Sequence, residues 1–279
     1  MYKVLLIIAL ALCAGCGRHT IETEVPACPA PVISKDTMIE QIRLRQADLV
    51  EFAAKGSAEV NMLAEGRKES LNNVTAYFSD KENIVIRVSH TFGTALLLGT
   101  NDDQFWYWLN FSDINDLYRG RKELLESCGA RGLKTFPASE TFGIIDTDGL
   151  ADSQMFFGEY EHGFDIIDEN GYILRSYSFN NCSGQLSRIA YYERGGLVVS
   201  ADFSDFMPLN GSMMLPGKTR IFSLRDSLEL EFDTSRIIPL SLSESKKAKL
   251  YSMPKPSKDT NIYELNDDCY FQSTDDDRY

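Results

Sequence analysis

The sequence contains few histidines and none of the motifs that mark the common catalytic sites. Its 279 residues include three histidines, His19, His90 and His162, which lie far apart in the chain. The motifs H-E-x-x-H, G-x-S-x-G, G-x-x-x-x-G-K-[ST] and G-x-G-x-x-G do not occur. These absences remove the usual signatures of metalloproteases, α/β-hydrolases, P-loop proteins and dinucleotide-binding proteins. We therefore predict that the chain is not an enzyme.

The sequence also lacks the spacings that are typical of metal sites. No C-x-x-C pair follows residue 16, and Cys182 and Cys269 are too isolated in the chain to indicate zinc. Residues 146–149 read D-T-D-G, which is similar to the start of a calcium loop. No third ligand and no terminal Glu follow at the spacing of an EF-hand, however. We therefore expect no metal and no cofactor.

An excess of basic residues is absent as well. Lys and Arg number 28 against 41 Asp and Glu, so the net charge is 28 − 41 = −13, and the sequence pI is about 4.7. Proteins whose main partner is a nucleic acid or an anionic membrane surface present basic patches. We therefore expect no nucleic-acid partner. The hydrophobic content of 43% is ordinary for a globular protein that buries a core.

The N-terminus has an apolar run that is too short to span a membrane. Lys3 precedes the apolar residues 4–12, which have the length of a signal-peptide core. The run ends in C-A-G-C at residues 13–16. Small residues directly before a cysteine resemble the lipobox of bacterial lipoproteins, in which the peptide is cut before the cysteine and the cysteine carries the lipids. The resemblance implies a lipoprotein signal peptide at residues 1–15 and acyl chains, such as palmitate, on Cys16.

The residue after Cys16 bears on the membrane that would hold this anchor. Gly17 stands where enteric lipoproteins that stay in the inner membrane have Asp, so the resemblance implies lipid anchoring in the outer membrane, facing the periplasm. Residues 16–35 contain three prolines and no apolar periodicity, so we expect the lipidated cysteine to be followed by a flexible tether. The alternative is an ordinary signal peptide cut near Gly15 or Gly17, which leaves Cys16 a plain thiol.

Four further cysteines would be exported with the mature chain. Cys28, Cys128, Cys182 and Cys269 permit up to two disulfides in an oxidising envelope. Their spacing leaves the pairing open.

After the tether the pattern predicts one helix and then a long series of strands. The run T-M-I-E at residues 37–40 forms a capping box, and apolar residues at helical spacing continue toward Gly56, so we predict a helix over residues 37–55. The apolar period then changes to two. The first predicted strands lie at residues 57–63, 67–80, 84–89, 94–99 and 104–109. Residues 118–121 are a short strand or turn, and residues 122–133 are ambiguous.

The second half is interpreted in the same way. Ser139 is the expected N-cap of a short helix that ends at Leu150, over residues 137–150. Asn170-Gly171 between two alternating runs is a strong hairpin signal. The predicted strands lie at residues 155–161, 164–168, 172–179, 185–194, 197–203, 218–224 and 228–232. From residue 241 the composition shifts to Lys, Ser and Pro, so residues 241–279 are predicted to be a C-terminal extension, partly disordered or with a late strand at residues 249–253.

Sequential hairpins with few crossovers predict one continuous antiparallel sheet. A sheet of about eleven strands must curl, and the two predicted helices are then available to cover its concave face. The expected fold class is α+β, mainly β, with an incomplete β-barrel in residues 36–240.

The most aromatic predicted strand follows two apolar ones. Both tryptophans of the chain, Trp106 and Trp108, stand two apart in it and so share one face, while Phe105 and Tyr107 share the other. A strand with aromatic side chains on both faces must pack against apolar groups on each side or line a cavity. The alternation does not decide which pair would face the cavity.

Several stretches together have the order of a known family. They are the helix at 37–55 followed by Gly56, I-R-V at residues 86–88, the turn and strand G-T-N-D-D-Q-F-W-Y-W at residues 99–108, Y-R-G-R at residues 118–121, the helix at 137–150 and the hairpin at 216–232. This order resembles the LolA/LolB-like family of bacterial outer-membrane lipoprotein-sorting proteins, in particular its branch of uncharacterised lipoproteins. The resemblance covers most of residues 36–240.

The resemblance implies a half-barrel whose hollow binds lipid acyl chains or lipoproteins, with a role in lipoprotein sorting or outer-membrane maintenance. The residues then expected to line the hollow are Phe105, Trp106, Tyr107, Trp108, Ile86, Val88, Phe52 and Ile42. Arg87 would be a latch between the sheet and its helical lid, or else a solvent-facing strand residue. The alternative function is a non-enzymatic envelope interaction or sensor protein with a solid core, a protein partner and no lipid cargo.

Overall fold

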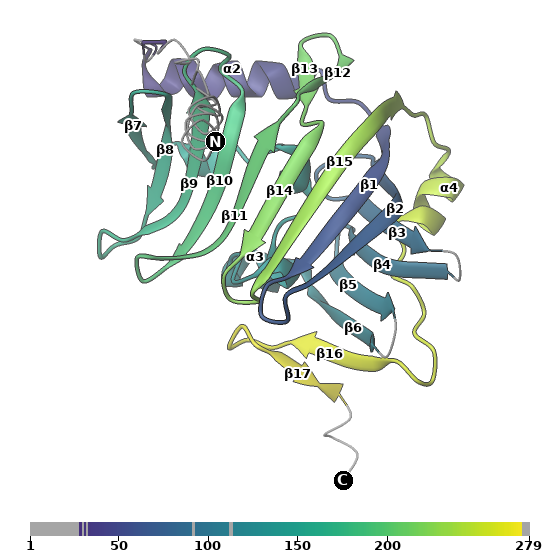
Figure 1. The fold of residues 1–279 in the computed structure, drawn as a ribbon. Coiled ribbons are helices and arrows are strands. Elements are labelled where there is room, and N and C mark those ends of the chain that lie inside the picture. Colours follow the sequence, from purple (N-terminus) through teal and green to yellow (C-terminus); the bar gives the residue numbers. More distant parts are fainter. Residues whose placement is uncertain (1–27, 30, 32, 91–92, 112–113, 275–279) are drawn as a thin grey trace, which may run out of the picture.

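The computed structural model describes residues 28–274, apart from residues 30, 32, 91–92 and 112–113 (Figure 1). The predicted signal peptide, Cys16 and most of the tether lie outside the described residues. Within the described part of the chain, no helix has both the length and the apolar character that a membrane crossing requires.

One curved sheet of fifteen strands dominates the fold, and it does not close into a barrel. Its first meander consists of β1 (Phe52–Met62), β2 (Arg67–Phe78), β3 (Ile84–His90), β4 (Gly93–Thr100), β5 (Gln104–Phe111) and β6 (Ile114–Arg121). The second consists of β7 (Gln154–Phe157), β8 (Glu161–Ile167), β9 (Ile173–Asn180), β10 (Leu186–Glu193), β11 (Gly196–Ser204), β14 (Lys218–Ser223) and β15 (Leu228–Pro239). Antiparallel pairing of β1 with β15 joins the two meanders in the middle of the sheet.

The predicted strand number of about eleven was wrong, because short strands at one edge were missed. β16 (Asn261–Leu265) and β17 (Phe271–Ser273) come from the predicted extension and continue the sheet beyond β6. The β16–β6 pairing is parallel, whereas every other pairing in the sheet is antiparallel. A separate two-stranded hairpin, β12 (Met207–Asn210) and β13 (Met213–Leu215), was also missed. The strand predicted at residues 249–253 was wrong, since α4 (Glu244–Leu250) takes the first part of it.

The first helix begins and ends earlier than predicted. Helix α2 spans Lys35–Ala47, and its N-cap is Ser34, whose Oγ accepts a hydrogen bond from the backbone N–H of Thr37 at 3.2 Å. The predicted capping box starting at Thr37 was therefore wrong by one turn. Residues 52–55 belong to β1 instead, because Phe52 pairs with Phe78 on one side and Pro239 on the other. Pairing on both edges overrides the local helical pattern.

The predicted helix at residues 137–150 was also wrong. The chain there makes two 3₁₀ turns, Ser139–Phe142 and Asp148–Leu150, and the first is preceded by Ala138 rather than capped by Ser139. Gly143 ends the first turn with φ of 68°, a left-handed conformation that glycine adopts without strain, and its N–H bonds the Glu140 carbonyl. The ambiguous segment before it contains α3 (Lys122–Cys128).

Two segments cover the two faces of the sheet. Residues 122–150, here called the covering segment, lie inside its curve together with part of α2 (Figure 1). Residues 244–260, here called the C-terminal segment, pack on the outside of β3 to β6. The disulfide Cys128–Cys269 ties the end of α3 to the β16–β17 turn, and a second disulfide joins Cys28 to Cys182.

Candidate functional site on the concave face

The concave face carries most of the predicted lining residues. Ile86 and Val88 from β3, Phe52 from β1 and Ile42 from α2 are all buried in one large apolar cluster. Tyr107 from β5 belongs to the same cluster. Phe105 lies beside it, in a smaller cluster with Leu125 and Cys128 of α3. The structure therefore brings six of the eight predicted residues to the inner side of the sheet, and their role in binding stays a prediction.

The two tryptophans point to the outside of the sheet. Trp106 is 2% exposed and packs with Val85, Leu97 and Tyr251 of the C-terminal segment, and Trp108 packs against the same cluster. Gly99 makes room for the Trp106 indole, since a Cβ there would lie 2.2 Å from Trp106 Cζ2. The choice between the two aromatic pairs is thus decided in favour of Phe105 and Tyr107 on the concave side.

The covering segment fills the concave face instead of leaving it open. Phe136, Phe142, Ile144 and Leu150 of this segment are buried in the concave cluster. Two gaps between it and the sheet measure about 20 and 30 Å³. Gaps of that size have room for about one or two water molecules each and not for an acyl chain, so the covering segment closes the interior at these places.

Polar contacts fasten the covering segment to the elements around it. Thr219 of β14 donates its hydroxyl hydrogen to the Thr141 carbonyl at 2.9 Å. Gln46 of α2 bonds both the N–H of Ile145, at 2.9 Å, and its carbonyl, at 3.1 Å. The Leu133 N–H donates to the carboxylate of Asp226 in the β14–β15 turn at 2.7 Å. These bonds satisfy backbone groups that would otherwise be unpaired in a buried segment without regular structure.

The most specific of these contacts centres on a buried carboxylate. Glu140 lies in the 3₁₀ turn Ser139–Phe142 of the covering segment and is 3% exposed. Tyr191 of β10 donates to its Oε2 at 2.6 Å, and Tyr177 of β9 donates to its Oε1 at 3.0 Å. Arg175 of β9 places Nη1 at 3.6 Å from Oε1 and 2.8 Å from the Tyr177 hydroxyl, with its guanidinium over the Tyr191 ring. Together these four residues are the Glu140 cluster.

Burial controls the ionisation of this cluster. Removal from water raises the pKa of Glu140 above its ordinary value, although Arg175 and the two tyrosine hydroxyls pull that pKa down. Burial also raises the pKa of Tyr177 and of Tyr191 well above the ordinary value, and the neighbouring Glu140 adds to both shifts. The hydroxyl groups therefore keep their protons and act as donors to the carboxyl group.

Arg87, the predicted latch, lies on the other side of the sheet. It is exposed and alternates with the buried Ile86 and Val88, so it shares the outer face with Val85. The arginines that form ion pairs with the covering segment are Arg175, with Glu140, and Arg43 of α2, with Asp148.

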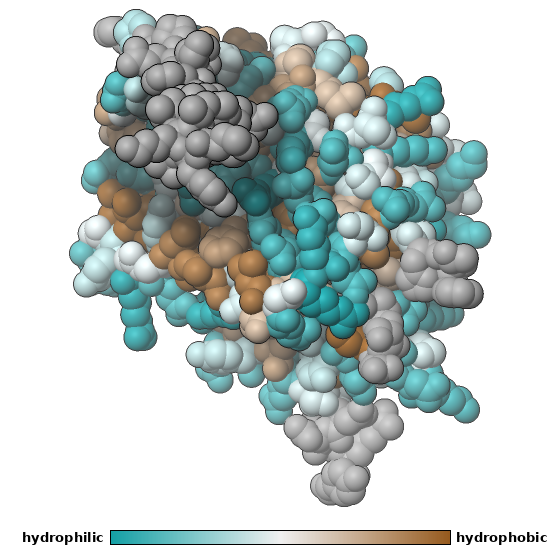
Figure 2. All heavy atoms as spheres, in the orientation of Figure 1, coloured by the Kyte–Doolittle hydropathy of each residue, from teal (hydrophilic) through white to brown (hydrophobic). Residues whose placement is uncertain are grey.

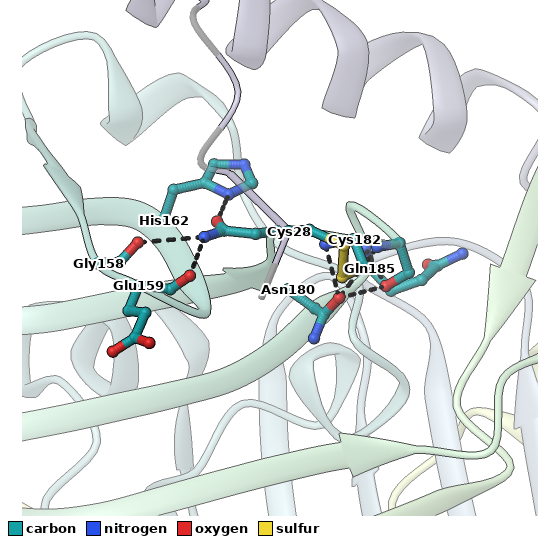
Figure 3. Close-up of a disulfide and its surroundings, with 9 residues drawn as sticks. Cys28, Gly158, Glu159, His162, Asn180, Cys182 and Gln185 are labelled. Carbon is teal, nitrogen blue, oxygen red and sulfur yellow. Dashed lines mark hydrogen bonds between the residues drawn. A yellow bond between two sulfur atoms is a disulfide. The ribbon is translucent and has the colours of Figure 1, made fainter. Parts of the chain in front are cut away.

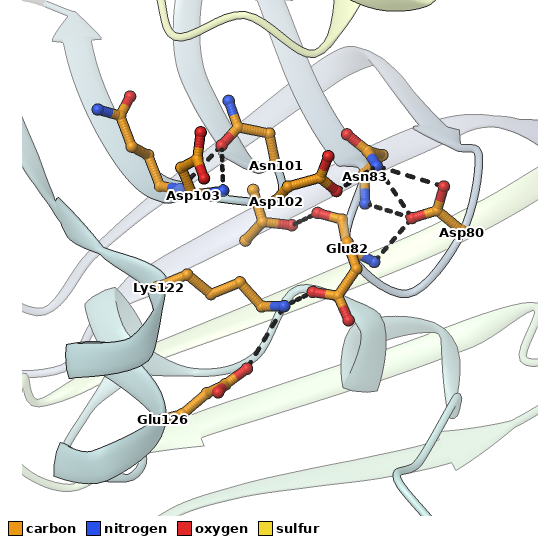
Figure 4. Close-up of polar contacts among 10 residues, drawn as sticks. Asp80, Glu82, Asn83, Asn101, Asp102, Asp103, Lys122 and Glu126 are labelled. Atoms are coloured by element: carbon orange, nitrogen blue, oxygen red, sulfur yellow. Dashed lines mark hydrogen bonds and ion pairs between the residues drawn. The ribbon is translucent and has the colours of Figure 1, made fainter.

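A cleft of about 900 Å³ opens where the covering segment meets the β2–β3 turn and α2. Apolar walls come from Leu49, Phe78, Leu125 and Ile144 among others, and Glu140 and Arg175 lie at its base. Lys122 of α3 pairs at the rim with Glu82, and with Glu126 at 3.4 Å (Figure 4). Polar and charged residues make up 15 of the 24 residues that line the cleft, so its apolar side chains lie among many polar groups, a mixture that suits an amphiphilic ligand.

Nothing in the described residues points to a metal centre. No group of three or more His, Cys, Asp or Glu side chains within residues 28–274 is placed to hold an ion. Asp148, from the D-T-D-G run, instead forms an ion pair with Arg43 of α2 at 3.6 Å.

No protein-family model and no curated protein matches the sequence. Solved structures do match the fold. A domain from Vibrio parahaemolyticus that is assigned to outer membrane lipoprotein sorting superposes with a TM-score of 0.53 at 11% identity, over 77% of this chain and 98% of that domain. A LolA superfamily protein from Nitrosomonas europaea superposes with a TM-score of 0.50 at 11% identity, over 79% of this chain and 98% of that protein.

The chain has a LolA-like fold. A DUF1329 family protein from Desulfovibrio piger shares it as well, with a TM-score of 0.50 at 13% identity over 79% of this chain and 97% of that protein. The resemblance seen in the order of strands and aromatic residues is thus confirmed at the level of the fold. The curved sheet and the covering segment on its concave face are therefore the parts of the fold most relevant to function.

Sequence reasoning missed the Glu140 cluster. One signal was available, since Arg175 and Tyr177 stand two apart in a predicted strand and so share a face. A second was the single acidic residue in the run P-A-S-E-T-F-G-I-I at residues 137–145, where apolar neighbours indicate burial. Nothing in the sequence linked that residue to Tyr191, because the contact spans 51 positions.

Proposed function

We propose that this chain is a non-enzymatic lipoprotein of the bacterial outer membrane, anchored by lipids on Cys16 and facing the periplasm, that binds acyl chains of lipids or lipoproteins between its curved sheet and the covering segment. The observation that carries the proposal is the cleft of about 900 Å³ at the edge of the covering segment, whose mixed lining includes apolar side chains such as Leu49, Phe78 and Ile144. The LolA-like fold supports it, because solved proteins of this fold include one assigned to lipoprotein sorting.

The cleft borders an interior that the covering segment fills together with part of α2. Apart from α3, this segment consists of three short 3₁₀ turns and the loops between them, bonded to the sheet and α2 by a small number of polar contacts. Movement of this segment away from the sheet would join the cleft to the apolar face formed by residues such as Ile86 and Tyr107. An acyl chain entering there would gain about 25 cal/mol for each Å² of apolar surface removed from water.

The Glu140 cluster has a structural role in this proposal and no catalytic one. Both carboxylate oxygens are already engaged by tyrosine hydroxyls and Arg175. A carboxylate that is 3% exposed and accepts a tyrosine hydroxyl on each oxygen is closed off from a substrate in solution.

Binding can be tested with a fluorescent fatty acid and a variant that narrows the cleft. Ala138 lines the cleft and is half-buried, whereas Ala151 is exposed outside it. We expect the Ala138→Trp variant to weaken binding at least tenfold and the matched Ala151→Trp variant to leave it unchanged. If Ala138→Trp does not fold, as judged by circular dichroism, Leu49→Gln on the same wall replaces it.

Native mass spectrometry of the full chain after gentle extraction provides the direct readout. Co-purified lipid that the fatty acid displaces supports the proposal. A chain that carries no lipid, and that binds the probe equally well in all variants, overturns it. Anchoring is checked separately, because a Cys16→Ser variant that stays in the membrane fraction contradicts lipidation at that residue.

The alternative, an envelope interaction protein with a solid core, has one observation in its favour. The cavities under the covering segment measure only about 20 and 30 Å³. This function predicts one stoichiometric protein partner from a lipid-free preparation, together with unchanged probe binding in the Ala138→Trp variant.

A further inference from the structure

The disulfide Cys28–Cys182 fixes the start of the described chain at one end of the sheet. Cys182 lies in the turn between β9 and β10, and 154 positions separate the two cysteines (Figure 3). The chain that precedes Cys28 is therefore joined to the described domain at this turn. A second contact holds the same place, since Arg45 of α2 donates to the Gly184 carbonyl in that turn.

The neighbouring turn between β7 and β8 is bonded to the same place. Asn181 donates from Nδ2 to the carbonyls of Gly158, at 3.1 Å, and Glu159, at 3.0 Å, and its backbone N–H bonds the Tyr160 carbonyl at 2.9 Å. Its Oδ1 lies 2.8 Å from His162 Nδ1 (Figure 3). The two turns and the disulfide thus form one connected unit.

Three large apolar side chains are exposed around this unit. Leu44 of α2, next to Arg45, is 60% exposed, and Phe157 and Tyr160 on either side of the β7–β8 turn are 53% and 54% exposed. We call these three residues the anchor corner. Aromatic and aliphatic side chains of this kind are favoured at the interface between a bilayer and water, where an apolar ring and a polar hydroxyl can both be accommodated.

We propose that the anchor corner docks on the surface of the phospholipid bilayer that holds the lipids of Cys16. The proposal rests on the anchoring part of the proposed function, and it adds which surface of the domain faces the membrane. The occupant is argued from where the chain outside the described residues joins the domain, which is at the disulfide.

Exposure alone would not select this corner. The opposite end of the strands carries exposed apolar residues too, Leu63, Tyr172, Leu174 and Leu224, and Figure 2 shows apolar residues gathered over the lower ends of β9 to β11. The disulfide Cys28–Cys182, where the preceding chain joins the domain, distinguishes the two ends of the strands. β9 is eight residues long, so the two ends lie about 26 Å apart. A relaxed coil of the length of residues 17–27 would span about 19 Å, which brings the disulfide end to the membrane more readily than the far end.

Charge indicates the kind of bilayer surface. Tyr160 stands between the exposed Glu159 and Glu161, Leu44 stands between Arg43 and Arg45, and the whole chain carries a net charge of −13. The charges at the corner therefore nearly balance, and an anionic surface would repel the chain as a whole, so a zwitterionic surface is the expected partner. Docking in phosphatidylcholine vesicles is therefore expected to exceed docking in phosphatidylglycerol vesicles, most clearly at low salt.

The experiment compares a reporter at the corner with one at the far end. The full lipidated chain, as the Phe157→Trp or the Leu224→Trp variant, is reconstituted by its own anchor in phosphatidylcholine vesicles that contain brominated phosphatidylcholine, which quenches nearby indoles. The signal of Trp106 and Trp108 is subtracted with the parent chain. We expect the added indole at residue 157 to be quenched at least twofold more than the one at residue 224. Tyr160→Trp is the second reporter if Phe157→Trp does not fold.

Equal quenching at the two positions, or stronger quenching at residue 224, overturns the docking surface while the anchor stands. A parent chain that does not float with vesicles removes the anchor, and the docking proposal fails with it. Replacement of both Cys28 and Cys182 by Ser lengthens the free chain to α2, so the contrast between the two reporters is expected to shrink. An unchanged contrast would show that the disulfide does not set the orientation.

Discussion

The sheet is covered on both faces, but by segments that are held in different ways. On the concave side the covering segment is fixed by the Glu140 cluster, in which every polar atom of the carboxylate has a partner. On the outside the C-terminal segment packs Tyr251 against Trp106. Its polar contacts include an ion pair between Lys247 and Glu51, a bond from Asn101 Nδ2 to the Tyr251 carbonyl at 3.1 Å and a bond from Asn115 Nδ2 to the Asp259 carbonyl at 3.1 Å.

The contact between the C-terminal segment, which forms the outer cover, and the sheet leaves two buried polar atoms without partners. Among the described residues, neither Trp106 Nε1 nor the Tyr251 hydroxyl has a hydrogen-bond partner. An unsatisfied buried group costs about 1–3 kcal/mol, whereas a satisfied polar network adds specificity of position. The C-terminal segment is therefore held mainly by the burial of apolar surface, and two polar atoms stay unpaired there. The covering segment, which forms the inner cover, is instead held in one defined position by the Glu140 cluster.

The disulfide Cys128–Cys269 links the covering segment to the edge of the sheet. Cys128 ends α3, and Cys269 lies in the β16–β17 turn, beyond the end of the C-terminal segment at residue 260. We expect β16, which follows the C-terminal segment and pairs with β6, to transmit a displacement of one segment to the other. The predictions that follow separate the contributions of the inner cover, of this connection and of the outer cover.

Removal of the buried carboxylate should have the largest effect. Glu140→Ala leaves Tyr177, Tyr191 and Arg175 without their shared partner inside the protein, and loss of one member of a buried pair costs about 3–5 kcal/mol. We expect the free energy of unfolding in urea to fall by that amount. Glu193→Ala, which breaks the surface pair with Arg225, is the control and should cost about 0–1 kcal/mol.

The neutral variant Glu140→Gln tests the raised pKa of the carboxyl group. The folded state keeps this proton to a higher pH than the unfolded state does. Protonation of Glu140 therefore contributes its full share to the free energy of unfolding at any pH below the ordinary pKa of a glutamate. It is lost as the pH rises through the raised pKa. The stability of the wild type relative to Glu140→Gln should therefore decrease with rising pH. An increase over that range would contradict the direction of the shift.

Loss of the connecting disulfide should have the next largest effect. The double variant Cys128→Ser, Cys269→Ser opens a loop of 141 positions, and native disulfides of this kind contribute about 2–4 kcal/mol. We expect a lower urea midpoint and faster proteolytic cleavage in both covers at once. Cleavage that increases in only one of them would show that the covers are not coupled.

The smallest expected effects on the free energy of unfolding come from a matched pair of variants, each of which removes one buried tyrosine hydroxyl. Tyr191→Phe removes a hydroxyl that donates to Glu140 at 2.6 Å and should cost about 1.5–3 kcal/mol, the value of a hydrogen bond to a charged group. Tyr251→Phe removes a hydroxyl without a partner and should leave the free energy of unfolding unchanged or raise it by about 1 kcal/mol. Thermal unfolding of both variants measures the pair, and a loss of equal size in the two would remove the distinction between the covers.

Local patterns predicted the strands well where alternation and turn residues agreed. The hairpin at Asn170-Gly171 formed as expected, with Gly171 at φ of 83°, and β2 to β5 lie close to their predicted ranges. Prediction failed where long-range pairing decided the outcome. Residues 52–55 joined β1 because β2 and β15 flank them, and residues 137–150 were shaped by contacts with β14 and α2 rather than by helix propensity.

The same division holds for the candidate site. Alternation alone established that Phe105 and Tyr107 oppose Trp106 and Trp108, because side-chain direction in a strand is a local property. Which pair faces inward was decided by Tyr251, about 145 residues away, which covers the tryptophans.

The sequence by itself determined the strand-rich composition, the order of elements that resembles the LolA/LolB-like family, and the two aromatic pairs. Only the tertiary structure decided that the concave face is closed, that Glu140 meets Arg175 and Tyr191, and that Cys28 pairs with Cys182. The physical reason is range: periodicity and turn chemistry act between neighbours, whereas the closure of a curved sheet and the burial of a charge depend on segments brought together from distant parts of the chain.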